Sequence, residues 1–273
     1  MLKRKAPLII ANWKTTPATL KEAITFVKTL EKKISTLKKK TSGINYFLAV
    51  PDIFVTSLIP LTKNGEVGTQ NINGKTLGEE TGLTIPSMIA SSGAAFTILG
   101  HSEVRARGED THELSQKVTL SLKAKLMTVL CVGESMRDKE GNYLSELEND
   151  LKIILADTDR GLFTNLVIAY EPVWAVGAKE SATVEECFEV VIALRRALAS
   201  LVGIDYAKKV SIIYGGSVNE ETSKGFLTHG GVDGLLIGRA SQDVKTFSAI
   251  LENCFKTKNV HRIHNRRLNN TKR

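Results

Sequence analysis

The sequence predicts an α/β protein, and more specifically a single-domain (β/α)8 barrel. Eight apolar runs of strand length recur along the chain, separated by segments with the apolar spacing of amphipathic helices. Several of these runs are apolar at successive positions, which is typical of parallel strands covered on both faces. The 273 residues suit one barrel of about 250 residues with short extensions.

The predicted strands alternate with the predicted helices. The strands cover residues 7–12, 46–50, 66–70, 96–100, 126–132, 166–170, 210–215 and 232–238. The clearest helix covers 184–202, where Thr183 and Glu186 form a capping box at the start. The other predicted helices cover 20–37, 114–122 and 220–228. Asn219 is the candidate N-cap of the last one.

An open doubly wound sheet is the alternative fold, because it also alternates strands and helices. Such a sheet often carries a glycine-rich phosphate loop after its first strand. No such motif follows residues 7–12, and the stretch 68–76 spaces its two glycines one residue too far apart for a P-loop. We therefore prefer the barrel.

The net charge of +8 is concentrated at the two ends of the chain. Residues 1–6 and 256–273 contain ten Lys and Arg and no acid; removing those ten leaves 27 basic against 29 acidic residues, a net of −2. We expect a basic N-terminal extension over 1–6, the barrel over 7–255 and a disordered basic tail over 256–273. The near-neutral body argues against specific nucleic-acid binding, although the tail could contact polyanions weakly.

The composition also bounds the cellular setting. No apolar run approaches the ~18 residues of a membrane span, and the apolar stretch near the N-terminus is too short for a secretory signal. Cys131, Cys187 and Cys254 show no metal-binding spacing, which favours reduced thiols, and His261 and His264 in the tail make a poor metal site. These features predict a cytoplasmic protein with no membrane partner and no bound metal.

Polar residues follow the predicted strands, at the end of a barrel where chemistry is usually found. In chain order they are Asn12, Lys14, Gln70, His101, Glu103, Glu171, Ser217 and Arg239. Each alone is weak evidence, but their joint placement is hard to obtain by chance. A carboxylate such as Glu171 at the end of a buried strand is costly unless it has a task.

Two glycine-containing loops, residues 214–219 and 237–241, follow the last two predicted strands. Glycine allows backbone N–H groups to approach an anion closely, and barrels often bind phosphate at this place. The alternative is that these glycines only permit tight turns. The presence of two such loops favours a phosphate site.

Each candidate side chain has two interpretations. Glu171 is either a buried ion-pair partner or a base whose apolar surroundings raise its proton affinity. His101 is either structural or a neutral hydrogen-bond donor at a helix N-terminus, and Lys14 is either a solvated charge or a cation that stabilises an oxyanion. Together they predict proton abstraction beside a carbonyl in a small phosphorylated substrate, without a metal or organic cofactor.

The motifs ANWK, LGHSE, CVGE, YEPVWA, YGGSVN and DGLLIGRAS resemble the triosephosphate isomerase family. The resemblance covers roughly residues 7–255, and several of the motifs are highly specific. It implies a TIM barrel that acts in glycolysis and gluconeogenesis. The implied reaction is the interconversion of dihydroxyacetone phosphate and glyceraldehyde 3-phosphate through an enediolate.

The resemblance assigns chemical roles to five residues of this chain. Glu171 would carry the proton between the two carbons. His101 and Asn12 would polarise the carbonyl. Lys14 would hold the negative charge, with Glu103 supporting Lys14 or the proton relay.

The resemblance also implies a phosphate site and a closing loop. Backbone N–H groups that would contact the phosphate belong to Gly177, Ser217, Gly238 and Arg239. A loop over 172–181 would close on the substrate, with Trp174 in its first hinge meeting Glu134, and with Tyr214 and Ser217 holding it closed. Residues 179–181 are Lys, Glu and Ser where the family usually has Gly, Lys and Thr, so we expect a stiffer loop.

The family is typically a homodimer in which the loop after the third strand inserts into the partner. Residues 78–83 occupy that place here, with Thr81 matching the inserted residue and Gln70 preceding the loop. Leu83 and Val104 stand where the family usually has Glu and Arg, so an interface ion pair is missing from both sides. Losing both partners is often neutral or stabilising, and we expect dimerisation to survive with less salt dependence.

Two other functions are weighed against this one. A different phosphate-binding barrel isomerase, acting on a sugar or anthranilate phosphate, would share the phosphate loops but need not share NWK, GHSE and YEPVW. A non-catalytic barrel that binds through its basic tail is disfavoured because every proposed catalytic residue is present.

Overall fold

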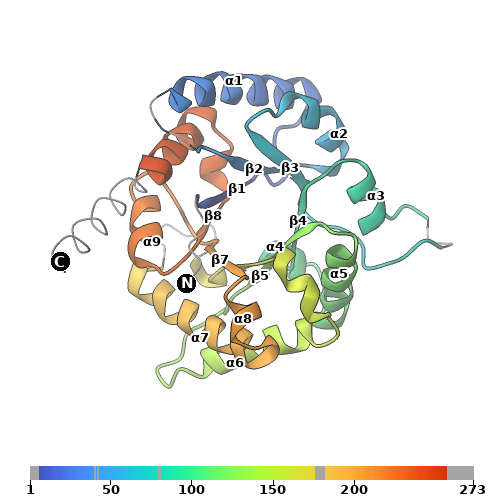
Figure 1. Ribbon diagram of the computed structural model, residues 1–273, viewed down its shortest axis with the longest axis vertical. Coiled ribbons are helices and arrows are strands. Elements are labelled where there is room, and N and C mark those ends of the chain that lie inside the picture. The colour runs from blue at the N-terminus through green and yellow to red at the C-terminus, as the bar shows by residue number, and fades with distance from the viewer. Residues whose placement is uncertain (1–5, 40, 42, 79–80, 176–181, 257–273) are drawn as a thin grey trace, which may run out of the picture.

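The protein folds as a closed barrel of eight parallel strands. A computed structural model describes residues 6–39, 41, 43–78, 81–175 and 182–256. Within them each strand is hydrogen-bonded to the next, and β8 closes the barrel against β1. Figure 1 shows the strands at the centre and the helices in a ring around them. The predicted (β/α)8 fold is confirmed.

All eight predicted strands form, with boundaries that differ by at most two residues from those expected. They are β1 Leu8–Asn12, β2 Tyr46–Ala49, β3 Gly65–Thr69, β4 Phe96–Leu99, β5 Met127–Val132, β6 Leu166–Tyr170, β7 Ser211–Tyr214 and β8 Gly234–Ile237. The labelled α-helices are α1 Leu20–Lys38, α2 Val55–Leu58, α3 Pro86–Ser91, α4 Ser102–Arg105, α5 Thr111–Lys123, α6 Asn142–Leu155, α7 Val184–Val202, α8 Ile204–Ala207 and α9 Ser223–His229, and a further helix covers the described residues 244–256.

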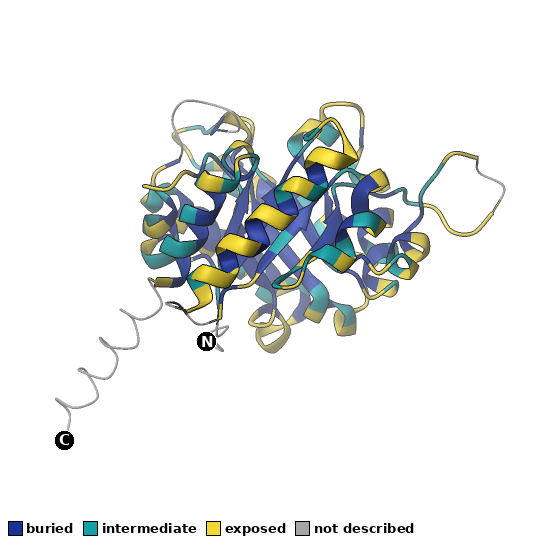
Figure 2. Cartoon of the chain, turned by 90° about the horizontal axis from the view of Figure 1, so that it is seen from above, coloured by how far each residue is buried: buried dark blue, intermediate teal, exposed yellow. Residues whose placement is uncertain are grey.

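The strands are buried on both faces because their side chains alternate between two cores. Ile10 and Ile98 belong to the cluster inside the barrel, whereas Ile9 and Leu99 pack outward with the helices. Fully burying a side chain of this size contributes about 1.5–3 kcal/mol. Figure 2 shows the buried strands between helices whose outer faces are exposed. The strands are therefore apolar at successive positions because one face of each strand packs inside the barrel and the other packs against the helices.

The capping box predicted for α7 is present. The Thr183 backbone N donates to Glu186 Oε2 at 2.7 Å, and the Glu186 backbone N donates to Thr183 Oγ1 at 3.1 Å. Each side chain satisfies an N–H group that has no partner within the helix. The long amphipathic helix that carries the sixth crossover therefore begins where the sequence indicated.

Two other predicted helix starts were wrong. Helix α5 begins at Thr111 because the Asp110 side chain caps it, accepting from the Glu113 N at 2.7 Å. Helix α9 begins only at Ser223, because Asn219 Oδ1 accepts from the Glu221 N at 2.9 Å and from the Thr222 N at 2.8 Å and so closes a separate turn. Asn219 is therefore not the N-cap of α9.

Several predictions concern the chain ends and the thiols. Residues 1–5 and 257–273, with His261 and His264, lie outside the described residues, so the boundaries of the two extensions stay predictions. Cys131, Cys187 and Cys254 are buried and form no disulfide. No helix in the described ranges is long and apolar enough to cross a membrane.

Candidate active site

A cavity of about 380 Å³ opens at the carboxyl ends of the strands. It brings together seven residues that the sequence singled out: Asn12, Lys14, His101, Glu171, Ser217, Gly238 and Arg239. They come from the ends of β1, β4, β6, β7 and β8, which are far apart in the chain and adjacent only because the barrel closes. Six of the eight polar residues predicted to share a site thus line one cavity, whereas Gln70 and Glu103 are not among its lining residues.

Glu171 follows β6 directly and is only 2% exposed. Its backbone N donates to the Val132 carbonyl at 2.8 Å, which continues the β5–β6 pairing by one residue. Its carboxylate has two partners from the end of β4. Oε1 lies 3.0 Å from His101 Nε2, and Oε2 accepts from the Ser102 backbone N at 2.9 Å. The buried acid thus has a backbone N–H donor on one oxygen and the imidazole of His101 beside the other.

His101 is the N-cap of α4 and is itself buried. Its Nδ1 accepts a hydrogen bond from the Glu103 backbone N at 3.2 Å. A ring nitrogen that accepts carries no proton, so the neutral ring has its proton on Nε2. His101 therefore presents an N–H donor to Glu171 and to the cavity.

Lys14 has an unusual backbone conformation, with φ of 55°. Non-glycine residues seldom adopt this left-handed region, and here the Lys14 N donates to Asn12 Oδ1 at 3.0 Å. The Lys14 ammonium group pairs with Glu103 Oε1. Partial burial acts to raise the pKa of Glu103, but the hydrogen bond and charge of Lys14 lower it below its ordinary value. The ionised form of Glu103 is therefore favoured at the edge of the cavity.

The loops after β7 and β8 form the other end of the cavity. A side chain at Gly216 would place its Cβ 2.2 Å from the hydroxyl oxygen of Tyr214, so only glycine fits there. Ser241 Oγ donates to the carbonyls of Ile237 at 2.8 Å and Gly238 at 2.7 Å and braces the second loop. The backbone near Ser217 and Gly238 can therefore approach a bound group closely.

Some predicted residues lie away from the cavity. Trp174 Nε1 donates to Glu134 Oε1 at 2.9 Å, the contact that the resemblance implied. The Tyr214 hydroxyl is buried without a hydrogen-bond partner among the described residues, and burial raises its pKa. Gly177 and residues 179–181 lie outside the described residues.

The residues predicted for a subunit contact are also placed. Gln70 is tied to its own chain, because its Nε2 donates to the Ala49 carbonyl at 3.0 Å. Thr81 is exposed on the segment between β3 and α3, which projects from the body in Figure 1. Leu83 and Val104 are half-buried. Neither of these two aliphatic residues brings a charge to the surface.

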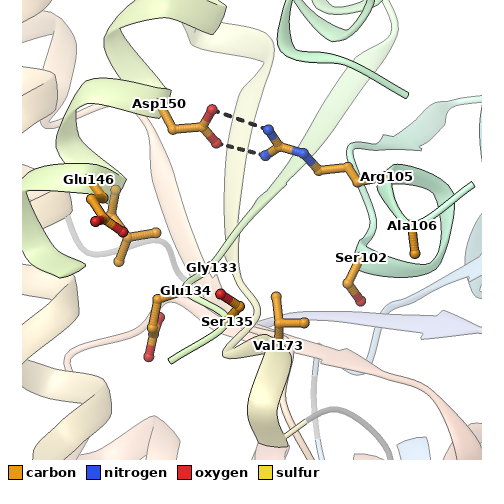
Figure 3. Close-up of a pocket in the computed structure, with 10 residues that line it drawn as sticks. Ser102, Arg105, Ala106, Gly133, Glu134, Ser135, Glu146, Asp150 and Val173 are labelled. Carbon is orange, nitrogen blue, oxygen red and sulfur yellow. Dashed lines mark hydrogen bonds and ion pairs between the residues drawn. The ribbon is translucent and has the colours of Figure 1, made fainter. Parts of the chain in front are cut away.

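A second cavity, of about 390 Å³, lies beside the first. It is lined by residues of α4, α6 and the end of β5, drawn in Figure 3. The arginine among its lining residues is Arg105, which donates two hydrogen bonds to Asp150, at 2.7 and 3.2 Å. The hydrogen bond to Asp150 raises the pKa of Arg105, although burial opposes this. Although it is as large as the first cavity, Glu171, His101 and Lys14 are not among its lining residues.

The sequence missed several groups around the first cavity. The Ser102 N–H holds Glu171, and a backbone donor leaves no residue pattern to find. Leu236 and Gln242 also line the cavity. Gln242 Nε2 donates to the Trp13 carbonyl at 3.1 Å and so ties the loop after β8 to β1. Its position after the GRAS motif was the only available signal.

The fold and the cavity define a (β/α)8-barrel enzyme in which a buried carboxylate, an imidazole and a lysine meet at the carboxyl ends of the strands. The family profile described as triosephosphate isomerase matches residues 7–254. The chain therefore belongs to the triosephosphate isomerase family and is an isomerase.

Curated relatives agree with this assignment. A triosephosphate isomerase of Clostridium botulinum (strain Loch Maree / Type A3) is 34% identical over 249 residues, which are 90% of this chain and 99% of the relative. One of Porphyromonas gingivalis (strain W83) is 35% identical over 250 residues, covering 90% and 98%. One of Bacteroides fragilis (strain YCH46) is 34% identical over 248 residues, covering 90% and 97%. The similarity thus spans the whole length of these enzymes.

Proposed function

We propose that the protein interconverts dihydroxyacetone phosphate and D-glyceraldehyde 3-phosphate in the cytoplasm, with Glu171 as the proton carrier. The observation that carries this proposal is the contact of 3.0 Å between Glu171 Oε1 and His101 Nε2 at the wall of the cavity. A buried base beside a neutral N–H donor suits the removal of a proton next to a carbonyl.

The first step follows from the competition for one proton donor. The Nε2 atom of His101 lies 3.0 Å from Glu171 Oε1, and a substrate carbonyl oxygen at this donor would replace the carboxylate. The freed Glu171 oxygen then takes the proton from the carbon beside the carbonyl. The electron pair of the broken C–H bond forms the enediolate, whose oxygen is stabilised by His101 and Lys14.

The second step returns the proton to the neighbouring carbon. Glu171 gives back the proton that it took, and a proton moves between the two substrate oxygens through the N–H donor of His101. Asn12 supports this by holding the backbone of Lys14. Glu103 keeps the Lys14 ammonium group in place through their ion pair. The substrate is isomerised and no group of the protein is consumed.

The phosphate would bind at the loop end of the cavity. We assign its contacts to the backbone N–H groups of Ser217, Gly238 and Arg239, with Gly177 as a further donor outside the described residues. Trp174, Glu134 and Tyr214 are proposed to control the loop that covers the substrate. Their support is the hydrogen bond between Trp174 and Glu134 and the buried, unpaired hydroxyl of Tyr214.

We propose a homodimer as the working form, with Thr81 and the loop that follows Gln70 meeting a second copy. The exposure of Thr81 on a projecting segment supports this. We assign no membrane or nucleic-acid partner, and the basic tail has no role in catalysis. Sedimentation at micromolar protein should give a dimer at low and high salt, and a monomer would contradict the proposal.

The test of the reaction is a coupled isomerase assay on the wild type and on Glu171→Asp. The substitution shortens the base by one methylene and keeps its charge. Misplacing a reacting group by about 1 Å can cost about 10²-fold, so we expect a large fall in kcat and a small change in KM. Equal turnover in the two proteins would disprove the role of Glu171. A wild type without activity would disprove the proposed function itself.

A further inference from the structure

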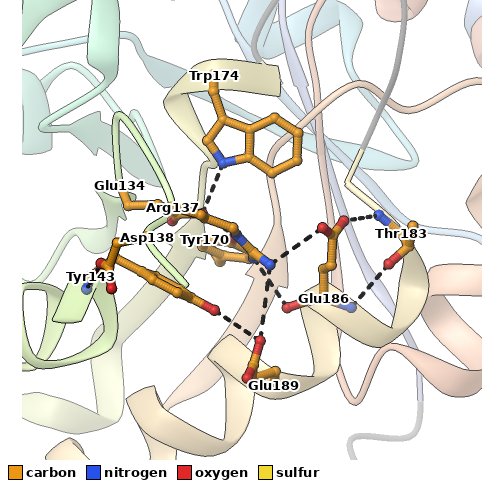
Figure 4. A network of polar contacts seen from close by, with 9 residues as sticks. All are labelled: Glu134, Arg137, Asp138, Tyr143, Tyr170, Trp174, Thr183, Glu186 and Glu189. Atoms are coloured by element: carbon orange, nitrogen blue, oxygen red, sulfur yellow. Dashed lines mark hydrogen bonds and ion pairs between the residues drawn. The ribbon is translucent and has the colours of Figure 1, made fainter. Parts of the chain in front are cut away.

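Arg137 belongs to the segment between β5 and α6. In space its side chain lies between the end of β6 and the start of α7, in the network drawn in Figure 4. Its side chain is only 17% exposed. The guanidinium Nε donates to Glu134 Oε1 at 2.9 Å, and Nη2 donates to the Tyr170 hydroxyl at 2.8 Å. It also stacks over the Trp174 ring, with Cζ 5.5 Å from the centroid. One side chain thus contacts residues on both sides of Glu171.

Glu134 depends on these contacts. It is 5% exposed, and its Oε1 accepts from Arg137, the Tyr170 hydroxyl and Trp174 Nε1, each at 2.9 Å. Its Oε2 has no hydrogen-bond partner among the described residues. A buried carboxylate needs a positive partner, and in the described chain the cation paired with Glu134 is Arg137.

Glu134 in turn holds the segment that contains the base. Its side chain accepts from Tyr170, one residue before Glu171, and from Trp174, three residues after it. Its backbone carbonyl accepts from the Val173 N at 3.0 Å. The chain is therefore fastened to Glu134 before and after Glu171. A shift of Glu134 would move both flanks of the base.

The other side of Arg137 contacts the first turn of α7. Nη1 lies 3.5 Å from Glu186 Oε1 and 3.9 Å from Glu189 Oε2, and Nη2 donates to the Glu186 carbonyl at 3.4 Å. Glu186 is the acid of the capping box with Thr183. Since a planar guanidinium has several donors in a fixed geometry, it can join these acids in one arrangement.

We propose that Arg137 is a positioning residue for Glu171, acting through Glu134 and anchored by Glu186. The role goes beyond charge neutralisation, because the fork geometry fixes where Glu134 sits. It rests on the proposed function of Glu171 as the proton carrier. Loss of Arg137 would leave the base present but misplaced, so catalysis would fall while the substrate still bound.

Two substitutions of Arg137 separate geometry from charge. Arg137→Gln removes the charge, whereas Arg137→Lys keeps it and loses the fork. We expect Arg137→Gln to lower kcat by about tenfold to hundredfold, since misplacement by about 1 Å has effects of this size. KM should stay within about twofold of the wild type, because the substrate-binding groups are untouched. The kcat of Arg137→Lys should lie between those of the wild type and Arg137→Gln.

A spectroscopic measurement reports the same site without activity. The chain has two tryptophans, and Trp13 is 1% exposed whereas Trp174 is 36% exposed. Acrylamide quenching of tryptophan fluorescence therefore reports mainly on Trp174. We expect stronger quenching in Arg137→Gln, because Trp174 loses its cation contact and a firmly held acceptor.

Arg195→Gln is the matched control. Arg195 is similarly buried, at 24% exposure, and is paired with Asp233 at 2.6 Å. Its Nη1 donates to the Val210 carbonyl at 2.5 Å, so it lies at the opposite end of the barrel, where β7 and β8 begin. The melting temperature of Arg195→Gln should fall, as in the Arg137 variants. Its kcat, KM and tryptophan quenching should equal those of the wild type.

Three results would overturn the proposal. One is wild-type kcat in folded Arg137→Gln, and another is an equal loss of kcat in Arg195→Gln. The third is wild-type kcat in Arg137→Lys, which would show that charge alone suffices; this variant carries the test if Arg137→Gln does not fold. An active wild type with any of these results would leave the isomerase assignment intact.

Discussion

The Nε2 atom of His101 lies 3.0 Å from Oε1 of Glu171, at a wall of the cavity shared by β4 and β6. Because Nδ1 accepts a hydrogen bond from the Glu103 N–H, the proton of the neutral ring is on Nε2, and Nε2 is the donor. One imidazole thus both caps α4 and lies beside the carboxylate of Glu171. The structural role of this ring and its proposed catalytic role can be tested separately.

The substitution His101→Asn separates these two roles. Asn is among the best N-cap residues, so it can still accept from the Glu103 N and keep α4 stable. It cannot replace the Nε2–H donor. We expect an unchanged melting temperature and a fall in kcat of about 10²–10³, the usual cost of losing one oxyanion donor. A coupled assay and a thermal melt test this. Unchanged turnover would make His101 a purely structural residue.

Arg239 is expected to attract the anionic substrate. Among the residues that line the cavity, Lys14 is paired with Glu103 and Glu171 is acidic, whereas Arg239 is exposed and no ion pair is formed by it within the described chain. Without Arg239 the cavity and its ion pair would carry a net negative charge. This would disfavour a phosphate dianion.

The substitution Arg239→Gln tests this effect. We expect KM and the inhibition constant of inorganic phosphate to rise about threefold to tenfold, with kcat unchanged, because the guanidinium attracts the anion and does not touch the reacting carbons. The difference from the wild type should shrink at high salt, because exposed charges are screened. A difference that does not change with salt would point to a direct packing role.

Glu31 is expected to make the fold sensitive to acid. Burial acts to raise its pKa, but hydrogen bonds from the Tyr46 hydroxyl, Asn64 and the Lys63 N lower the pKa below its ordinary value. A carboxyl whose pKa is lower in the folded state stabilises the protein above its unfolded pKa of about 4.3. This stabilisation is lost as the pH falls through the folded value.

The substitution Glu31→Gln should therefore lower the free energy of unfolding by about 1–3 kcal/mol at neutral pH, the usual cost of disrupting buried hydrogen bonds to a charged group. The two proteins should converge in stability as the pH falls below the ordinary carboxyl pKa of about 4.3 and through the lower folded-state pKa of Glu31. Urea unfolding at several pH values measures this. A destabilisation that is the same at every pH would show that packing, and not the ionised carboxylate, is responsible.

Local patterns in the sequence predicted much of the fold. Successive apolar residues revealed the strands because each is buried on both faces, as Ile9 and Ile10 show for β1. The Thr183 and Glu186 pair marked the start of α7 because a capping box closes within four residues. Asn219 misled because the same side chain can close a turn just as well.

The sequence by itself determined the strands, the helices α1, α5 and α7 among the long ones, most of the polar residues around the cavity and, through its motifs, the family. The tertiary structure decided which groups hold them: the Ser102 N–H on Glu171, the guanidinium of Arg137 on the Tyr170 hydroxyl, and the pair of Arg195 with Asp233. The physical reason is that these contacts are mostly made by side chains and backbone groups brought together only by barrel closure. Such partners have no fixed spacing along the chain, whereas helix caps and strand burial do.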